Sequence, residues 1–396
     1  MNIHTQTRGR KAKSSMPLPD QVALLFQGGG ALGSFQAGAY EKLDELGIDI
    51  DWVAGISIGA VNAAIIAGNP PGQRMEKLRR FWEKVSGGMP NLWLPDNDHI
   101  REAAHMAAAS AVAMFGVPGM FRPHLIPAPF MPEGSKGATS FYDAQPLRQT
   151  LDELVDWDLL NDGSVRLSVG AVDVESGNFA YFDTRGKDGG RGVNTRIDAR
   201  HIMASGALPP GLPAVEIDGR YYWDGGIVSN TPLAYVLDHQ REDMLVFQVD
   251  LFPAEGPLPR QMSDVCSRQK DIQFSSRTRQ VTDIYLRLRR EHKAIRAVLN
   301  HLPAEMCGDP EVQRVRALLD EGAVNIVHLI YRSRAWESGA RDFEFSRGTM
   351  LDHWGQGRDA VDDVMHKGDL IARNILDGTS ATFDLDRPDH LKEKKA

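Results

Sequence analysis

The stretch that decides the fold runs from Ile50 to Ala64 and reads IDWVAGISIGAVNAA, with Ser57 at the centre of the GISIG segment 55–59. An apolar run ends at Gly55, and an alanine-rich segment with helical character begins at Gly59. The pattern predicts a strand, a sharp turn and a helix, with the serine hydroxyl exposed at the apex of the turn. The glycines two positions before and after the serine let the strand and the helix approach closely. Ser57 is therefore a candidate nucleophile, and the alternative is a glycine-rich turn with an incidental serine.

A second glycine-rich turn lies upstream, where the apolar segment 22–26 runs into QGGGALG at 27–33. We expect segment 22–26 to be a buried strand and segment 34–46 to be a helix. Backbone N–H groups at such a turn form a concavity that binds an anion, and Gly28, Gly29 and Gly30 supply them here. The N–H of Ile58, directly after the serine, is a further donor expected at such an elbow. A concavity of this kind stabilises the oxyanion of an acyl-transfer intermediate.

The same turn also matches the dinucleotide-binding pattern G-x-G-x-x-G through Gly28, Gly30 and Gly33. A dinucleotide fold needs an acidic residue at the far end of its second strand to hold the ribose. Here Asp49 and Asp51 precede the second strand, and its far end carries the serine elbow instead. A nucleotide-dependent oxidoreductase is therefore a weaker interpretation, and we predict no cofactor.

A third motif, YYWDGGI at 221–227, is preceded by ASGALPP at 204–210 and followed by NTPL at 230–233. Together, the glycine loop, the G-x-S-x-G elbow and the D-G-G turn resemble the patatin-like phospholipase family in order and separation, over roughly Val22 to Val236. This resemblance implies that Ser57 and Asp224 form a catalytic dyad beside the glycine-loop oxyanion hole. The motifs are completed by Gly33, Gly55, Gly59, Gly225 and Gly226. In one departure, the family often has Arg or Lys before the last glycine of its loop, where this chain has Leu32.

The fold expected from this resemblance is α/β, a three-layer α/β/α sandwich with a mainly parallel central sheet built from the region Val22 to Val249. The expected function is that of a serine-dependent lipid acyl hydrolase of the phospholipase A or esterase type, acting on a lipid or another acyl ester. The alternative is a non-catalytic lipid- or protein-binding module on the same fold, which the intact Ser57 and Asp224 disfavour. The sequence leaves open which acyl ester is cleaved.

A serine, aspartate and histidine triad of the α/β-hydrolase kind would place a histidine after Asp224. His239 and His292 are available, but neither lies in a local signature. The glycine loop precedes the serine by only about 29 residues, at the start of the fold, which is the patatin arrangement.

The amino-acid composition limits the classes of protein to which the chain can belong. With 396 residues, 42% hydrophobic and 25% charged, the chain is long enough for one large domain and a smaller appendage. Its two cysteines, Cys266 and Cys307, cannot build a disulfide framework, and no metal-ligand spacing accompanies them, so we predict no metal and a reducing compartment. The formal net charge of −8 argues against general nucleic-acid binding.

The chain shows no membrane or export signal. The first twenty residues are polar and basic, and no run approaches the ~20 apolar residues of a membrane span. We therefore predict a cytoplasmic, soluble protein, and the sequence leaves open whether it contacts membranes peripherally through residues 268–296.

Three regions are expected. Residues 1–20 read as a disordered arm, 21–255 as the catalytic domain and 256–396 as an α-rich C-terminal region. Within the catalytic domain, segment 87–140 is rich in Met, aromatic residues and Pro, and is interpreted either as a lid over a lipid site or as a packing insertion. A strand at 165–172 pairs as a hairpin with 179–182, a short helix covers 199–207, and 245–249 is the last strong strand of the domain.

A basic amphipathic helix is predicted in the C-terminal region. Residues 268–296 contain nine Lys or Arg against three acidic residues, a local net charge of +6. Apolar residues at 281, 284, 288, 295, 298 and 302 fall on one stripe. Such a helix can bind an anionic membrane surface, or it can be a solvated helix docked on the core. A strand at 325–331 and terminal helices over 349–376 follow, and the oligomeric state stays open.

Overall fold

The computed structural model describes residues 16–88, 97–186, 192–319, 322–334, 337 and 339–384, and within them a ten-stranded sheet organises the chain. The strand order is β12-β11-β10-β1-β2-β5-β6-β7, and β9 pairs with both β5 and β8. The strands are β1 Gln21–Phe26, β2 Trp52–Gly55, β5 Arg166–Asp173, β6 Phe179–Asp183, β7 Gly192–Asn194, β8 Val215–Ile217, β9 Arg220–Asp224, β10 Met244–Asp250, β11 Val324–Ile330 and β12 Ala381–Phe383. The short pair β3 Arg122–Pro123 and β4 Tyr142–Asp143 forms a separate ribbon.

The six strands from β12 to β5 in this order are parallel to their neighbours. Strand β5 then pairs antiparallel with β6 and with β9, so the predicted hairpin is confirmed and the β9 strand is added to it. The prediction of a mainly parallel central sheet is likewise confirmed.

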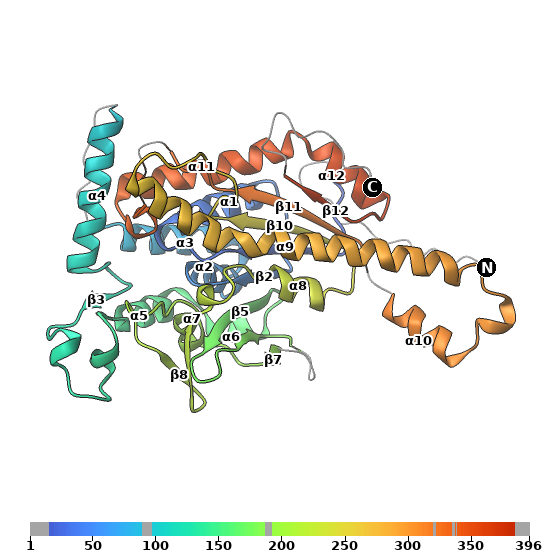
Figure 1. Cartoon of the computed structure of the whole chain (residues 1–396), viewed down its shortest axis with the longest axis horizontal. Coiled ribbons are helices and arrows are strands. Elements are labelled where there is room, and N and C mark those ends of the chain that lie inside the picture. Colours follow the sequence, from blue (N-terminus) through green and yellow to red (C-terminus); the bar gives the residue numbers. More distant parts are fainter. Residues whose placement is uncertain are drawn as a thin grey trace.

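Helices cover both faces of the sheet (Figure 1). They are α1 Gly33–Glu45, α2 Ile58–Ala67, α3 Pro71–Val85, α4 Asp98–Phe115, α5 Gln145–Leu154, α6 Trp157–Asp162, α7 Ala199–Ser205, α8 Leu233–His239, α9 Met262–Leu299, α10 Pro310–Leu318, α11 Arg347–Met365 and α12 Gly368–Leu376. Strand β1 shows how the layers form, because Leu24 and Phe26 join the core under α1 and α2, while Ala23 and Leu25 face α8. Because alternate residues of a strand point to opposite faces, a continuous apolar strand such as β1 requires both helical layers.

The C-terminal region belongs to this same sheet. Strand β11 lies parallel to β10, and β12 lies parallel to β11, so the sheet extends beyond the region Val22 to Val249 from which the sequence predicts it to be built. Helix α11 packs along α1 so closely that a Cβ on Gly38 would come within 1.9 Å of the carbonyl oxygen of Trp354. The indole N–H of Trp354 donates to Glu41 at 2.8 Å. Residues 21–255 and the C-terminal region therefore share one hydrophobic core.

Two predicted segments fall partly outside the described residues. Most of the 1–20 arm lies there, as do residues 89–96 of the 87–140 insertion. In the described remainder of the insertion, α4 projects from the edge of the body (Figure 1). None of the helices in the described ranges combines the length and the hydrophobicity needed to cross a bilayer.

Candidate active site

Ser57 occupies a strained turn between β2 and α2. Its backbone has φ 55° and ψ −123°, a conformation that residues other than glycine rarely adopt. Hydrogen bonds from other segments stabilise this turn. The Ser57 N–H donates to Ser205 Oγ at 2.9 Å, and Ser205 Oγ donates in turn to the Gly170 carbonyl at 2.6 Å. A Cβ on Gly55 would lie 2.3 Å from the Gly59 carbonyl oxygen, and one on Gly59 would lie 2.6 Å from that of Phe26. Both glycines are therefore required for strand and helix to meet at this turn.

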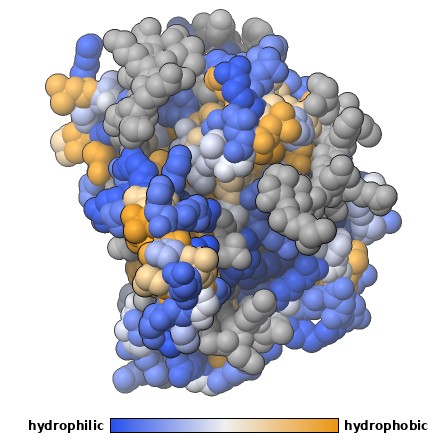
Figure 2. Space-filling view, turned by 90° about the vertical axis from the view of Figure 1, so that its right-hand side faces the viewer, coloured by the Kyte–Doolittle hydropathy of each residue, from blue (hydrophilic) through white to orange (hydrophobic). Residues whose placement is uncertain are grey.

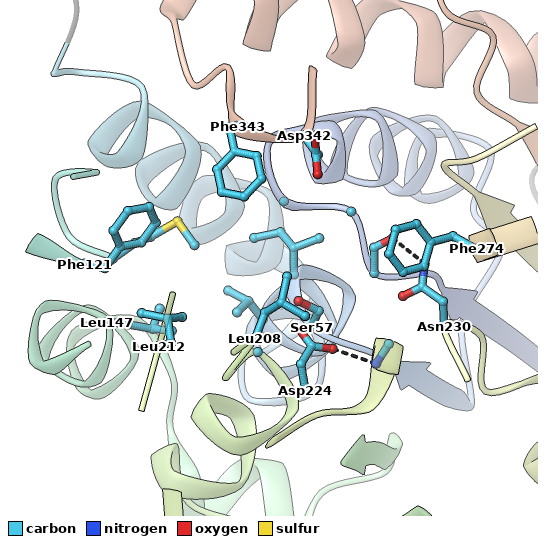
Figure 3. Close-up of a pocket in the computed structure, with 18 of the residues that line it drawn as sticks. Ser57, Phe121, Leu147, Leu208, Leu212, Asp224, Asn230, Phe274, Asp342 and Phe343 are labelled. Atoms are coloured by element: carbon cyan, nitrogen blue, oxygen red, sulfur yellow. Dashed lines mark hydrogen bonds between the residues drawn. The ribbon is translucent and has the colours of Figure 1, made fainter. Parts of the chain in front are cut away.

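Asp224 ends strand β9, which pairing with β5 brings to the elbow. The carboxylate is buried, and its Oδ1 accepts a hydrogen bond from the Gly226 N–H at 2.7 Å. Burial raises the pKa of Asp224 to about 6, while the Gly226 N–H and the Ser57 hydroxyl oppose this rise. The close-up shows Asp224 directly beside Ser57 (Figure 3). A carboxylate with a pKa near 6 is a better proton acceptor at neutral pH than an ordinary aspartate.

The glycine loop lies against the elbow. A Cβ on Gly33 would come within 2.6 Å of Ile58 Cγ1, which explains why a glycine stands there. Asn230 holds the start of the loop through two hydrogen bonds. Its side-chain Nδ2 donates to the Gly28 carbonyl at 2.9 Å, and its backbone carbonyl accepts the Gly28 N–H at 3.3 Å. In the described part of the chain, the N–H groups of Gly29 and Gly30 have no such acceptor. Of the three predicted loop donors, Gly28 is therefore already hydrogen-bonded within the protein, and no acceptor is seen for the other two among the described residues.

One cavity of about 140 Å³ joins these groups. Ser57, Asp224 and the glycine loop line it together with Ile58 and Gly226. Its remaining wall is largely apolar and comes from distant parts of the chain: Val61, Met120, Phe121, Leu147, Gly206, Leu208, Leu212, Phe252, Phe274, Phe343 and Phe345, with Asn230 and Asp342 as polar members (Figure 3). The arrangement places a hydroxyl, a carboxylate and a glycine loop in the wall of a largely apolar pocket.

The cavity brings together the predicted site residues Ser57, Asp224, Gly28, Gly29, Gly30, Ile58 and Gly226. Gly225 lies behind them, where a Cβ would approach the Gly170 carbonyl oxygen to 2.7 Å. Neither His239 nor His292 lines this cavity, and His239 instead lies on α8 with its Nδ1 2.8 Å from the Tyr235 carbonyl oxygen. The described residues include no group of three or more side chains suited to hold a metal.

Sequence reasoning missed several residues of the site. Asn230 and Ser205 lie inside the motifs quoted above, and both are buried in the structure. Their polar side chains are the signal in the sequence that could have indicated their roles. Phe274, Asp342, Phe343 and Phe345 come from the C-terminal region, far from the motifs, and carry no local signal.

Comparisons with known proteins indicate the family to which the chain belongs. A family model described as patatin-like phospholipase matches residues 24–237, and one described as patatin phospholipase matches residues 272–375. Among solved structures, VipD from Legionella pneumophila is 14% identical with a TM-score of 0.38, and the alignment covers 91% of this chain and 70% of VipD. Human GIVD cytosolic phospholipase A2 is 14% identical with a TM-score of 0.44, covering 91% of this chain and 60% of that protein. The search of curated proteins found no match.

Proposed function

Because this chain belongs to the patatin-like phospholipase family, we propose that it is a serine-dependent lipid acyl hydrolase of the phospholipase A or esterase type. The observation that carries the proposal is the buried Asp224 carboxylate beside the Ser57 hydroxyl, in a cavity that also contains the N–H groups of Gly29 and Gly30. Fold alone does not define an activity, so the proposal rests on these groups.

The first half of the proposed reaction forms an acyl-enzyme. Ser57 Oγ attacks the ester carbonyl carbon while its proton passes to the Asp224 carboxylate. The carbonyl oxygen becomes an oxyanion, which accepts hydrogen bonds from the N–H groups of Gly29, Gly30 and Ile58. The tetrahedral intermediate then collapses, the bond to the alcohol oxygen breaks, and the protonated Asp224 returns its proton to the leaving alcohol.

The second half regenerates the enzyme. Asp224 accepts a proton from a water molecule as that water attacks the acyl carbonyl, and the same N–H groups stabilise the new oxyanion. Collapse of this intermediate releases the carboxylic acid, and the proton on Asp224 returns to Ser57 Oγ. The single carboxylate thus serves as base and acid in both halves, so the chemistry needs no histidine.

A fluorophosphonate probe tests this proposal, since it reacts with activated serines. We expect covalent labelling that mass spectrometry locates at Ser57, absent in Ser57→Ala, together with hydrolysis of at least one member of an acyl-ester series. A folded protein that takes no label and cleaves no ester would instead favour the alternative, a lipid- or protein-binding module.

We also propose that the 87–140 insertion acts as a lid. Its Met120 and Phe121 line the cavity, and Leu125, Ile126 and Phe130, which follow in the sequence, expose much of their apolar surface. Exposed apolar side chains beside a lipid-cleaving site favour contact with a lipid surface.

We further propose that helix α9 contacts an anionic membrane surface. Some basic side chains of the helix form hydrogen bonds within the protein. Arg268 donates to the carbonyls of Pro253 and Ala254, and Arg289 donates to the carbonyl of Gly322. Arg287, Arg290 and Lys293 remain exposed on the projecting half of the helix. Seen from that end of the molecule, hydrophilic residues cover most of the surface that is coloured by hydropathy, and hydrophobic residues form separate groups (Figure 2). The exposed basic residues of α9 suit electrostatic adsorption rather than deep insertion.

A further inference from the structure

The charges that face the catalytic cavity are of one sign. Among the described residues that line it, Asp224 and Asp342 are the charged ones, and none is Lys, Arg or His. Leu32, in the glycine loop, is fully buried in the hydrophobic core and brings no cation either. The cavity thus offers backbone donors to a forming oxyanion but no cationic side chain to a phosphate.

Asp342 is fixed against the oxyanion loop. A Cβ on Gly30 would lie 2.2 Å from the Asp342 carbonyl oxygen, so the two backbones are in direct contact. The Asp342 carboxylate accepts hydrogen bonds from Lys270 Nζ at 2.8 and 3.0 Å. The neighbouring Arg341 pairs with the buried Asp271, so two ion pairs fasten this segment to α9.

The residues that line the cavity decide which charge a substrate meets. Asp342 is one of these residues, and Lys270 is not. The Lys270 ammonium also sits 5.5 Å from the centre of the Phe343 ring, which itself forms part of the wall. An anionic group in the cavity would therefore meet a wall that contains two carboxylate residues and, among the described lining residues, no cationic side chain, in a partly desolvated site where like charges repel strongly.

From this geometry we propose that Asp342 is a specificity-determining residue that restricts the cavity to acyl esters without negative charge near the scissile carbonyl. The substrate class is then neutral acyl esters, such as glycerides, rather than anionic phospholipids. This inference rests on the hydrolase activity proposed above.

A matched pair of substrates tests it: monolauroylglycerol and lauroyl lysophosphatidic acid, which share an acyl chain and differ by the phosphate. Both are presented at the same low mole fraction in neutral detergent micelles, which keeps the surface charge of the phosphate-ester micelles small. We expect kcat/KM of the wild-type protein to favour the neutral ester by roughly tenfold or more, because juxtaposed like charges carry a large penalty. An equal kcat/KM, or a preference for the phosphate ester, overturns the inference and leaves the hydrolase proposal standing.

Two variants should change the preference for the neutral ester in opposite directions. Asp342→Asn removes the carboxylate and leaves the Lys270 cation, so the ratio of kcat/KM for the neutral ester to that for the phosphate ester should fall several-fold. Lys270→Met leaves the carboxylate uncompensated, so the same ratio should rise. Asp377→Asn, an exposed surface change at the end of α12, is the control for loss of one negative charge.

A purely structural role for Asp342 would lower kcat/KM for both esters together and leave their ratio unchanged. An unchanged ratio in Asp342→Asn, or a shift of the ratio in the same direction for both variants, therefore overturns the inference. If the wild-type protein cleaves neither ester and takes no fluorophosphonate label at Ser57, the hydrolase proposal itself fails, and the inference fails with it.

Discussion

Ser57 holds a backbone conformation that costs stability. A non-glycine residue in such a region costs roughly 1–3 kcal/mol, and the fold maintains it through the Ser205 hydrogen bond and the packed glycines of the elbow. Strain of this kind is expected where a side chain must be presented to a substrate rather than packed.

The strain leads to a first prediction. Ser57→Gly should raise the free energy of unfolding by about 1–3 kcal/mol relative to Ser57→Ala, because glycine adopts the positive φ without a steric penalty. Both variants lack the hydroxyl, so their comparison isolates the backbone. Urea unfolding at one pH measures the difference, and equal stabilities for the two variants would show that the turn stores no strain.

A second prediction concerns Asp224, whose pKa burial raises to about 6. As a general base it must be ionised, so activity that is present above pH 6 should be lost as the pH falls through this value. We expect kcat/KM for a neutral ester to drop about tenfold per pH unit below pH 6. Re-assay at pH 7.5 after the acid incubation controls for unfolding. A profile that stays flat down to pH 5 would exclude Asp224 as the base.

Segments far apart in the chain meet at the glycine loop. The short helix over Arg341–Phe343 lies on Gly30, and the Gln27 side chain accepts the N–H groups of Leu251 and Phe252 while donating to the Phe274 carbonyl. The loop is thus held by β1, by the end of β10 and by the C-terminal region at once.

Gly30→Ala is therefore predicted to damage turnover. The residue has φ 55°, and the added Cβ would lie 2.2 Å from the Asp342 carbonyl oxygen, so the loop must shift and its N–H groups lose their alignment. Losing one oxyanion donor costs about 10²–10³ in kcat. Gly72→Ala, where the Cβ meets nothing within 4 Å, is the matched control. A folded Gly30→Ala variant with wild-type kcat would remove this loop from the mechanism.

The exposed basic residues of α9 give a fourth prediction. Reversing Arg287, Arg290 and Lys293 to Glu should weaken binding to vesicles that contain anionic lipid by at least about tenfold, since each basic residue near such a surface contributes about 1 kcal/mol. Vesicles of neutral lipid alone control for apolar contact. If the wild-type protein binds both kinds of vesicle equally, or the triple variant binds as the wild type does, the helix has a structural role only.

Local patterns in the sequence were sufficient to predict the elements that build the candidate active site. The apolar strands β1 and β2, the G-x-S-x-G elbow and the D-G-G turn have short-range signatures, because tight turns demand glycine and buried parallel strands demand continuous apolar residues. The contacts of Asn230 with Gly28 and of Asp342 with Gly30 could not be predicted in this way. They join residues about 200 and 300 positions apart, and no local pattern encodes such a meeting.

At the level of the complete chain, one sheet underlies both regions that match family models. Residues 24–237 supply the strands from β1 to β9, and residues 272–375 supply β11 beside β10. The cavity follows the same plan, because Ser57 and Asp224 come from the first region, and Phe274, Asp342, Phe343 and Phe345 come from the second. The C-terminal region therefore contributes to the wall of this cavity and is not an independent appendage.

The central claim is that Asp224 alone serves Ser57 as its base, and turnover of an acyl ester by four folded variants tests it most directly. Asp224→Asn keeps the shape of the side chain and removes the base, so its kcat should fall as far as that of Ser57→Ala. His239→Ala and His292→Ala change histidines that do not line the cavity, and both should retain most of the wild-type kcat. A folded histidine variant as inactive as Ser57→Ala, or an Asp224→Asn variant with substantial turnover, would contradict the account.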